Sequence, residues 1–390
     1  MNKEDYQNST TGKVVQTSIH LTPYWAFVPN PLPPSIAPSW KLVNLLSEAD
    51  RELGIVAGLT RNIPDASILI EPFMRREAVL SSRIEGTHTV LSELYGYESG
   101  HMLPGFSRSN EVLLENQEVL NYVKALKVGL ERIKTEPINL ELIKELHRIL
   151  LYGVRGDEFT LGEFREVQNF IGRTNDPSEA IFIPTPVADL SAAVKKLENY
   201  LLTGNQYPPL IRIAMIHYQF ETIHPFLDGN GRVGRLVIVL LLVAWNLLPE
   251  PLLYPSSFFE RNRELYYENL LCLSKSGDWE HWLEFFLLMI IEESRATISR
   301  AKAMINLKDK WEQLLFRHKT SEHYFKIINS LFKKPFISVS DIEKLLEVTN
   351  KAARAMVERL AILGILNLVE EKKYGKIYQA NELIAILQIH

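Results

Sequence analysis

The residues best suited to chemistry stand together in one stretch, His224-Pro225-Phe226-Leu227-Asp228-Gly229-Asn230-Gly231-Arg232-Val233-Gly234-Arg235. It combines an imidazole, a carboxylate, a glycine-rich turn and two guanidinium groups. These are the groups needed to bind a nucleoside triphosphate, to neutralise its charge and to activate an attacking hydroxyl. The stretch therefore predicts a nucleotide site at which a phosphate-containing group is transferred.

The turn Gly229-Asn230-Gly231 precedes a strongly apolar segment with helical character. Its backbone N–H groups should therefore lie at a helix N-terminus, where unpaired donors and the positive end of the helix dipole bind anions. Glycine also lets the backbone approach a phosphate closely. Arg232 and Arg235 follow three residues apart, on neighbouring positions of the helix. Two guanidinium groups beside such a nest suit a polyphosphate better than a single carboxylate.

Asp228 stands at the mouth of this nest, where phosphate would repel its carboxylate unless a cation lies between them. Mg²⁺ fits, because it binds through few carboxylates together with phosphate oxygens and water. His224 ends the preceding apolar helix, and an imidazole there can take a proton from an incoming hydroxyl. A metal site made of His217 and His224 is a poor alternative, since seven residues place them two helical turns apart.

Composition indicates a globular protein and excludes several classes. The 390 residues are 46% hydrophobic with a formal net charge of -4, so the chain is not basic overall. Its length predicts two or three domains. Cys272 is the only cysteine, so no disulfide can form within the chain and a reducing, cytoplasmic location is expected. The N-terminus shows no signal peptide. The longest apolar run, residues 236–248, is too short to span a membrane, so no membrane partner is expected.

Helical patterns dominate the first 320 residues, after an N-terminal tip expected to be disordered and a proline-rich extended stretch. Between Phe164 and Pro186, two short apolar runs flank turn residues 172–178, which predicts a β-hairpin. The predicted helices cover residues 40–57, a segment from Pro64 to Gly86, two helices between 110 and 155 that break at Pro137, and residues 187–202, 209–223, 231–245, 261–273 and 280–296.

The pattern changes from about residue 320. A helix over residues 324–332 is followed by a capping box at Ser338 and Asp341 that opens a second helix. Thr349 can cap a third helix, which ends at Gly364. Two strands, 365–370 and 377–380, then complete the order of a winged helix. Its charge is only mildly positive, so DNA and protein stay open as alternative partners of this domain.

The twelve-residue stretch resembles the signature of the Fic family, HPF-x-D/E-GNGR-x-x-R. Leu161-Gly162-Glu163-Phe164-Arg165, followed by Ile171-Gly172, resembles the segment before the family's flap, and Ile181-Phe182-Ile183-Pro184 resembles the flap strand. The resemblance implies a mainly α fold, a helical core with a small β-hairpin flap, to which the sequence adds a C-terminal winged helix. We expect an N-terminal region over residues 1–105, a Fic core over 106–292, a helical linker over 293–320 and the winged helix over 321–390.

Fic proteins mostly transfer AMP from ATP to hydroxyl side chains of other proteins. The resemblance implies that activity here, with ATP and a target protein as partners, Mg²⁺ as cofactor and diphosphate as product. It implies that His224 is the general base, that Asp228 holds Mg²⁺, and that the flap residues Ile181, Phe182 and Ile183 pair with an extended target segment. The implied ATP-binding set is Asp228, Gly229, Asn230, Gly231, Arg232, Gly234, Arg235, Tyr266 and Tyr267. The target, the hydroxyl type (Tyr, Thr or Ser) and a homodimer stay open.

Ser81-Ser82-Arg83-Ile84-Glu85-Gly86 resembles the family's inhibitory motif, (S/T)-x-x-x-E-(G/N). Ser81 and Glu85 share a helix face, and Glu85 at a helix C-terminus opposes the dipole. The resemblance implies that Glu85 pairs with Arg235, the arginine expected at the γ-phosphate, and so inhibits transfer. In some relatives the same glutamate supports removal of AMP. Two alternatives remain, a Fic-fold enzyme with other phosphate-transfer chemistry and a DNA-binding regulator with a degraded core.

Overall fold

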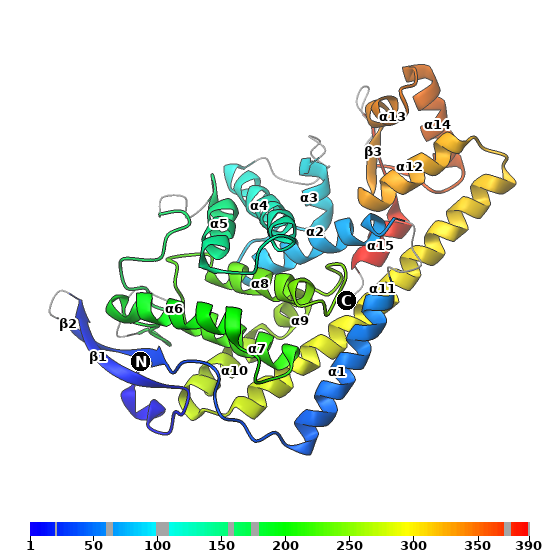
Figure 1. Cartoon of the computed structure of the whole chain (residues 1–390). Helices are drawn as coiled ribbons and strands as arrows, with labels where there is room; N and C mark the ends of the chain where they lie inside the picture. The colour runs from blue at the N-terminus through cyan, green and yellow to red at the C-terminus, as the bar shows by residue number, and fades with distance from the viewer. Residues whose placement is uncertain are drawn as a thin grey trace.

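The computed structural model describes residues 1–19, 22–59, 65–98, 109–154, 160–172, 179–369 and 376–388 of the chain. The fold is mainly helical, as the sequence predicts (Figure 1). Within these ranges no helix is both long and apolar enough to cross a membrane. In the described ranges the helices are accompanied by an N-terminal hairpin, an isolated bridge between Ile171 and Phe182, and a three-stranded C-terminal sheet.

Two packed helices position the twelve-residue stretch. Helix α7 (Pro209–Ile223) ends where the stretch begins, and α8 (Asn230–Ala244) starts at its glycine-rich turn. Both helices are apolar nearly all round, which is typical of helices buried on every side. The surrounding helices are α4 (Asn110–Arg132), α5 (Leu140–Leu151), α6 (Val187–Thr203), α10 (Arg263–Ser276) and α11 (Trp279–Arg317).

Helix α2 (Ser67–Ile84) brings the predicted inhibitory motif to this core. Most of its residues are buried, and it packs on α4, α8 and α9 (Ser256–Arg261). Helix α1 (Trp40–Leu59) lies along α11 (Figure 1). Helix α3 (Leu91–Glu98) follows α2. The boundary expected at residue 292 falls inside α11, which continues without a break through the predicted linker to Arg317.

The expectation for the N-terminus is wrong. After a short 3₁₀ helix (Lys3–Tyr6), strands β1 (Gly12–Ile19) and β2 (Thr22–Pro29) form an antiparallel hairpin in which Gly12 pairs with Pro29. Phe27 of β2 is fully buried and packs against Tyr6 and Phe182. Packing against a distant segment orders a stretch whose local composition indicates disorder.

The predicted flap hairpin is reduced to a single bridge. Ile171 donates its N–H to the carbonyl of Phe182 at 2.9 Å, and Phe182 donates back at 3.0 Å. No regular strand flanks this bridge among the residues described there. The predicted turn, residues 172–178, lies outside the described residues beyond Gly172.

The C-terminal unit has the predicted order of elements with two additions, β3 and α15. Its capping box is present, since Ser338 Oγ accepts from Asp341 N and Asp341 accepts from Ser338 N. The three strands form an antiparallel sheet in the order β3-β5-β4, and the unit packs on α2 and α11. Its elements are α12 (Glu322–Lys333), β3 (Phe336–Ser338), α13 (Val339–Leu346), α14 (Asn350–Ile362), β4 (Asn367–Leu368), β5 (Ile377–Gln379) and α15 (Asn381–Gln388).

Candidate active site

A cavity of about 760 Å³ opens where α7 meets α8. Most of the predicted site residues lie on its wall, although they come from four separate parts of the chain. The Ile171–Phe182 bridge forms one side and α10 another. The predicted site residues that line it are Glu85, Ile181, Phe182, His224, Asp228, Gly231, Arg235, Tyr266 and Tyr267.

The N-terminus of α8 forms an anion nest in this cavity. Gly229 caps the helix with φ of 77°, a left-handed conformation that glycine adopts without strain. The Asn230 side chain fixes the loop before it by accepting from Phe226 N–H at 2.9 Å and donating to Phe226 O at 2.8 Å. A Cβ on Gly231 would collide with Oε1 of Glu85. The Glu85 carboxylate therefore lies over the nest, where a helix N-terminus binds anions.

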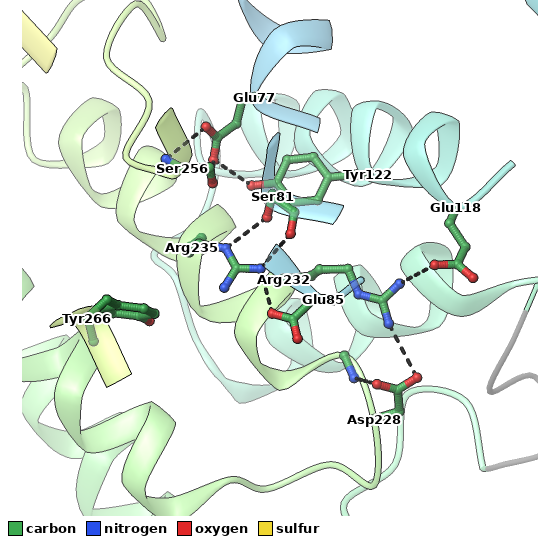
Figure 2. Close-up of polar contacts among 12 residues, drawn as sticks. Glu77, Ser81, Glu85, Glu118, Tyr122, Asp228, Arg232, Arg235, Ser256 and Tyr266 are labelled. Carbon is green, nitrogen blue, oxygen red and sulfur yellow. Dashed lines mark hydrogen bonds and ion pairs between the residues drawn. The ribbon is translucent and has the colours of Figure 1, made fainter. Parts of the chain in front are cut away.

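Arg235 is fully buried and binds the predicted inhibitory motif through three hydrogen bonds. Its Nε donates to Ser81 Oγ at 2.9 Å, and its Nη2 donates to Ser81 O at 2.9 Å and to Glu85 Oε1 at 2.7 Å (Figure 2). Burial disfavours the charged forms of Arg235 and Glu85, but the attraction between the two opposite charges outweighs this effect. Glu85 raises the pKa of Arg235, and Arg235 followed by Arg232 lowers the pKa of Glu85 below its ordinary value. Both side chains are therefore ionised.

Gly86, the last residue of the predicted inhibitory motif, follows the end of α2 with φ of 102°.

Arg232 forms a second buried ion pair that sequence reasoning missed. Its Nη1 lies 3.1 Å from Oε2 of Glu118 on α4, and both side chains are at most 3% exposed. Its Nη2 lies 3.3 Å from Oδ2 of Asp228 (Figure 2). No local signal marks Glu118, because its role depends on how α4 packs against α8.

Asp228 can take part in binding a metal–phosphate complex. Its Oδ1 accepts from Gly229 N–H at 2.6 Å, and its side chain stays 38% exposed at the cavity. In the described part of the chain, no group of three or more His, Cys, Asp or Glu residues could hold an ion without help. A single carboxylate fits Mg²⁺ when phosphate oxygens and water complete the coordination. The residues present therefore suit Mg²⁺ that arrives with a triphosphate.

The surroundings of His224 keep its imidazole neutral. It caps α7 in a left-handed conformation, with φ of 52° and ψ of 63°, which is uncommon for a residue other than glycine. Nδ1 lies 3.1 Å from the carbonyl oxygen of Glu221, so Nδ1 carries the proton and donates it. Burial lowers the pKa of His224 to about 4, with Arg165 adding to the effect. The imidazole is therefore neutral at pH 7, and Nε2 is the nitrogen that can accept a proton.

The two tyrosines of α10 occupy different environments. Tyr266 is fully buried, its ring stacks on Phe259 at 4.3 Å, and its hydroxyl lies 2.7 Å from Nε2 of His217. Tyr267 is 43% exposed and faces the cavity more openly. Tyr267 is thus more accessible for the expected nucleotide contact, whereas the ring of Tyr266 is packed in the aromatic core. The Tyr266 hydroxyl is thus the hydrogen-bond partner of Nε2 of His217.

Glu221 explains why glycine stands at position 234. A Cβ on Gly234 would collide with Oε1 of Glu221. Burial raises the pKa of Glu221 to about 8, so this cavity residue is largely protonated at pH 7. Gly234 therefore allows α7 and α8 to approach closely and is not itself on the cavity wall.

His147 of α5 fixes the loop from the other side. Its Nδ1 accepts from Gly162 N–H at 3.0 Å, so Nε2 carries the proton and donates to the Asp228 carbonyl at 3.1 Å. Its ring stacks on Phe226 with centroids 3.8 Å apart. Burial lowers the pKa of His147 to about 4, which keeps the ring in this neutral form.

The three predicted flap residues are not equally accessible. Ile181 is 54% exposed, whereas Phe182 and Ile183 are buried. The carbonyl of Ile183 already accepts the N–H of Phe27 from the N-terminal hairpin at 2.9 Å. Ile181 is thus the flap side chain that a bound segment could contact directly.

Two family models match the chain. Residues 43–131 match the Fic/DOC family N-terminal model and residues 137–242 match the Fic/DOC family model, together half of the chain. Curated relatives include the protein adenylyltransferases Fic of Drosophila grimshawi and Drosophila mojavensis, each 30% identical over 174 residues. These alignments cover 44% of this chain but only 32% and 31% of the relatives, so the chain matches about a third of their length.

Solved structures share the fold. A Fic family protein from Desulfovibrio desulfuricans G20 aligns with a TM-score of 0.58 and 21% identity, covering 90% of this chain and 98% of that one. Fic-1 from C. elegans aligns with a TM-score of 0.51 and 23% identity, covering 68% and 75%. At these identities the likeness concerns the fold alone.

Proposed function

Because the chain belongs to the Fic/DOC family, we propose that it is a protein adenylyltransferase that transfers AMP from ATP to a hydroxyl side chain. The observation that carries the proposal is the arrangement of His224, the α8 nest and Arg235 on the wall of one cavity. Relatives named protein adenylyltransferase Fic support the same reaction. None of the signature groups is missing, which disfavours a regulator with a degraded core.

The proposed reaction follows from the placement of these groups. The triphosphate would lie along the N-terminus of α8 with its far end at Arg235, and Asp228 would hold Mg²⁺, which would neutralise phosphate charge. Nε2 of His224 takes the proton of a target Tyr, Thr or Ser hydroxyl as its oxygen attacks the α-phosphorus. The new P–O bond forms while the bond between the α-phosphorus and the bridging oxygen of the β-phosphate breaks, and diphosphate leaves. The protein contributes chiefly position and charge stabilisation.

The second part of the proposal is that Glu85 inhibits this reaction. Its carboxylate occupies Arg235 at 2.7 Å and lies over Gly231. A phosphate would need the same guanidinium and the same N–H groups. Glu85 therefore competes with the γ-phosphate and leaves ATP, when bound, in an unproductive position. Reversal of the transfer, in which Glu85 would help to remove AMP from a modified hydroxyl, belongs to the same proposal.

Incorporation of label from ATP radiolabelled at the α-phosphate tests both parts. Replacing Glu85 by Gly should raise incorporation into the protein or its targets by ~10²-fold, the usual size of one electrostatic contribution in such a site. The double variant Glu85→Gly with His224→Ala should return to background. Mass spectrometry should find the mass of a 5′-AMP adduct on hydroxyl residues of the Glu85→Gly protein or of proteins in a lysate.

A matched control separates the site from general loosening of α2. Like Glu85, Glu98 pairs with an arginine: it binds Arg75 of α2 at 2.8 Å. Glu98 does not line the cavity. Glu98→Gly should leave incorporation at the wild-type level. Equally low incorporation by the wild type and by Glu85→Gly would remove the inhibitory role of Glu85. If Mg·ATP also failed to bind the Glu85→Gly protein in calorimetry, the adenylyltransferase proposal itself would fail.

A further inference from the structure

Arg165 is a buried arginine with an unusual set of partners. It is 4% exposed, and every acceptor that the described residues give its guanidinium is a backbone carbonyl. Burying a guanidinium without a carboxylate costs free energy, and burial lowers the pKa of Arg165 to about 10, which still leaves it charged at pH 7. Such a group persists where its five N–H donors satisfy backbone oxygens that would otherwise be unpaired.

Side chain and backbone of Arg165 each bind one carbonyl of the loop that joins α7 to α8. Nε of Arg165 donates to the carbonyl of His224 at 2.9 Å, and the backbone N–H of Arg165 donates to that of Pro225 at 2.9 Å. Asn169, four residues later, donates its Nδ2 to the carbonyl of Phe226 at 3.0 Å. Segment 165–169 therefore binds three consecutive carbonyls of the loop, and these bonds offset the cost of the left-handed conformation at His224.

The same guanidinium also holds both ends of the flap. Nη1 donates to the carbonyl of Val167 at 3.3 Å, on the way into the flap, and Nη2 donates to the carbonyl of Thr185, on the way out. Arg165 is absent from the described wall of the 760 Å³ cavity, so it has no place among the ATP contacts there. It lies instead on a neighbouring polar cavity of about 400 Å³ beyond Asp228.

We propose that Arg165 is a positioning residue that fixes the direction of the His224 imidazole and ties the flap to it. A single side chain then fixes the position of the base relative to the flap segment that presents a target hydroxyl. The inference rests on the proposed adenylyl transfer, because it assigns Arg165 a role in the transfer step and none in binding ATP.

The test compares nucleotide binding with turnover in the Glu85→Gly background. Arg165→Gln should keep the Kd for Mg·ATP within about twofold but lower kcat by ~10²-fold, the loss expected from misplacing a reacting group by about 1 Å. Arg165→Lys should lower kcat by at least ~10-fold, because one ammonium cannot serve the carbonyls of His224 and Thr185 together. The control is Arg148→Gln, since Arg148 is 54% exposed and only 4.0 Å from Glu163. It should leave both constants unchanged.

A second measurement does not require transfer. The ¹⁵N spectrum of the His224 ring, assigned by its loss in His224→Ala, should show the proton on Nδ1 in the Glu85→Gly parent and a mixture of tautomers in both Arg165 variants. An unchanged kcat, an unchanged tautomer, or a parallel loss of ATP affinity and kcat would each overturn the positioning role. A parent that binds Mg·ATP but transfers no AMP would contradict the proposed function instead, and the tautomer would still decide the role of Arg165.

Discussion

Oε1 of Glu85 lies 2.7 Å from Nη2 of Arg235 and directly above Gly231, so one carboxylate covers both anion-binding parts of the site. The ion pair accounts for the pKa shifts of both residues, and Ser81 holds the same guanidinium from the preceding turn of α2. Helix α2 is therefore bound to α8 through the arginine that we propose for the γ-phosphate of ATP. Glycine at position 231 makes room for either anion.

The space above Gly231 can be tested by a double-mutant cycle. In the wild type, Gly231→Ala should lower the free energy of unfolding by ~1–3 kcal/mol, because the new methyl group meets the Glu85 carboxylate. In Glu85→Gly the same change should cost less, because the methyl group then meets only the end of the Arg235 side chain, with Nη1 at 2.9 Å, and alanine favours a helix over glycine. Urea unfolding of the four proteins measures the coupling. Equal effects in both backgrounds would show that Glu85 does not occupy this space.

The pair of Arg232 and Glu118 is expected to matter for stability more than any exposed pair. Glu118→Gln removes the buried carboxylate from a guanidinium that is 1% exposed and leaves it only the more exposed carboxylate of Asp228, which should cost up to ~3–5 kcal/mol of unfolding free energy. The control is Glu131→Gln, because Glu131 and its partner Lys134 are 73% and 64% exposed. That change should cost under ~1 kcal/mol. Similar urea midpoints for the two variants would argue against a critical buried pair.

The pH dependence of transfer should reflect the lowered pKa of His224. Burial, then Arg165, lowers that pKa to about 4, while Glu85 and Asp228 act in the opposite direction. The base is unprotonated above its pKa, so kcat/KM of the Glu85→Gly protein at saturating Mg²⁺ should stay nearly level from pH 7 down to pH 5. An ordinary histidine would lose ~20-fold over that range. A pH–rate profile decides between them, and a midpoint near 6.5 would contradict the prediction.

Local sequence signals predicted the helices that flank residues 224–235. They did not predict features that depend on packing between segments distant in the sequence. Helix α7 has its predicted bounds, because Pro209 stands at its first position and Pro225 follows His224. The turn Gly229-Asn230-Gly231 was predicted to precede a helix, and α8 begins at Asn230. The ion pair between Glu85 and Arg235, expected from the family resemblance, is present in the structure.

The failures have identifiable physical causes. Hairpin β1–β2 depends on Phe27 packing against Phe182, more than 150 residues away. Glu118 and His147 act across helix and loop contacts with no local signature. Arg165 stands in a segment that resembles the family, but its contacts with the carbonyls of His224 and Thr185 depend on how distant segments pack. The predicted end of the last core helix near residue 296 was wrong. Residues 279–317 contain no glycine or proline that would end a helix, and α11 continues to Arg317.

Glu77 anchors α2, and its titration should be visible in the stability of the whole protein. It is fully buried, accepts from Ser256 Oγ at 2.6 Å and Ser256 N at 3.1 Å, and accepts from the Tyr122 hydroxyl at 3.2 Å (Figure 2). Burial raises the pKa of Glu77 to about 7. A carboxyl whose pKa is higher in the folded state stabilises fully below its unfolded pKa, near 4.5, and loses that contribution as pH rises through 7.

The variant Glu77→Gln cannot titrate and isolates this effect. Between pH 5 and pH 8 the unfolding free energy of the wild type should fall relative to Glu77→Gln, by up to ~3 kcal/mol for a shift of this size. Urea unfolding at several pH values measures the difference, and Glu131→Gln serves as the control with no pH-dependent difference expected. Glu77 lies one turn before Ser81 on α2. Weaker anchoring of this helix at pH 8 should therefore also make Glu85 of the wild type separate more readily from Arg235. A constant difference between the two proteins across this range would mean that Glu77 is already ionised in the folded state.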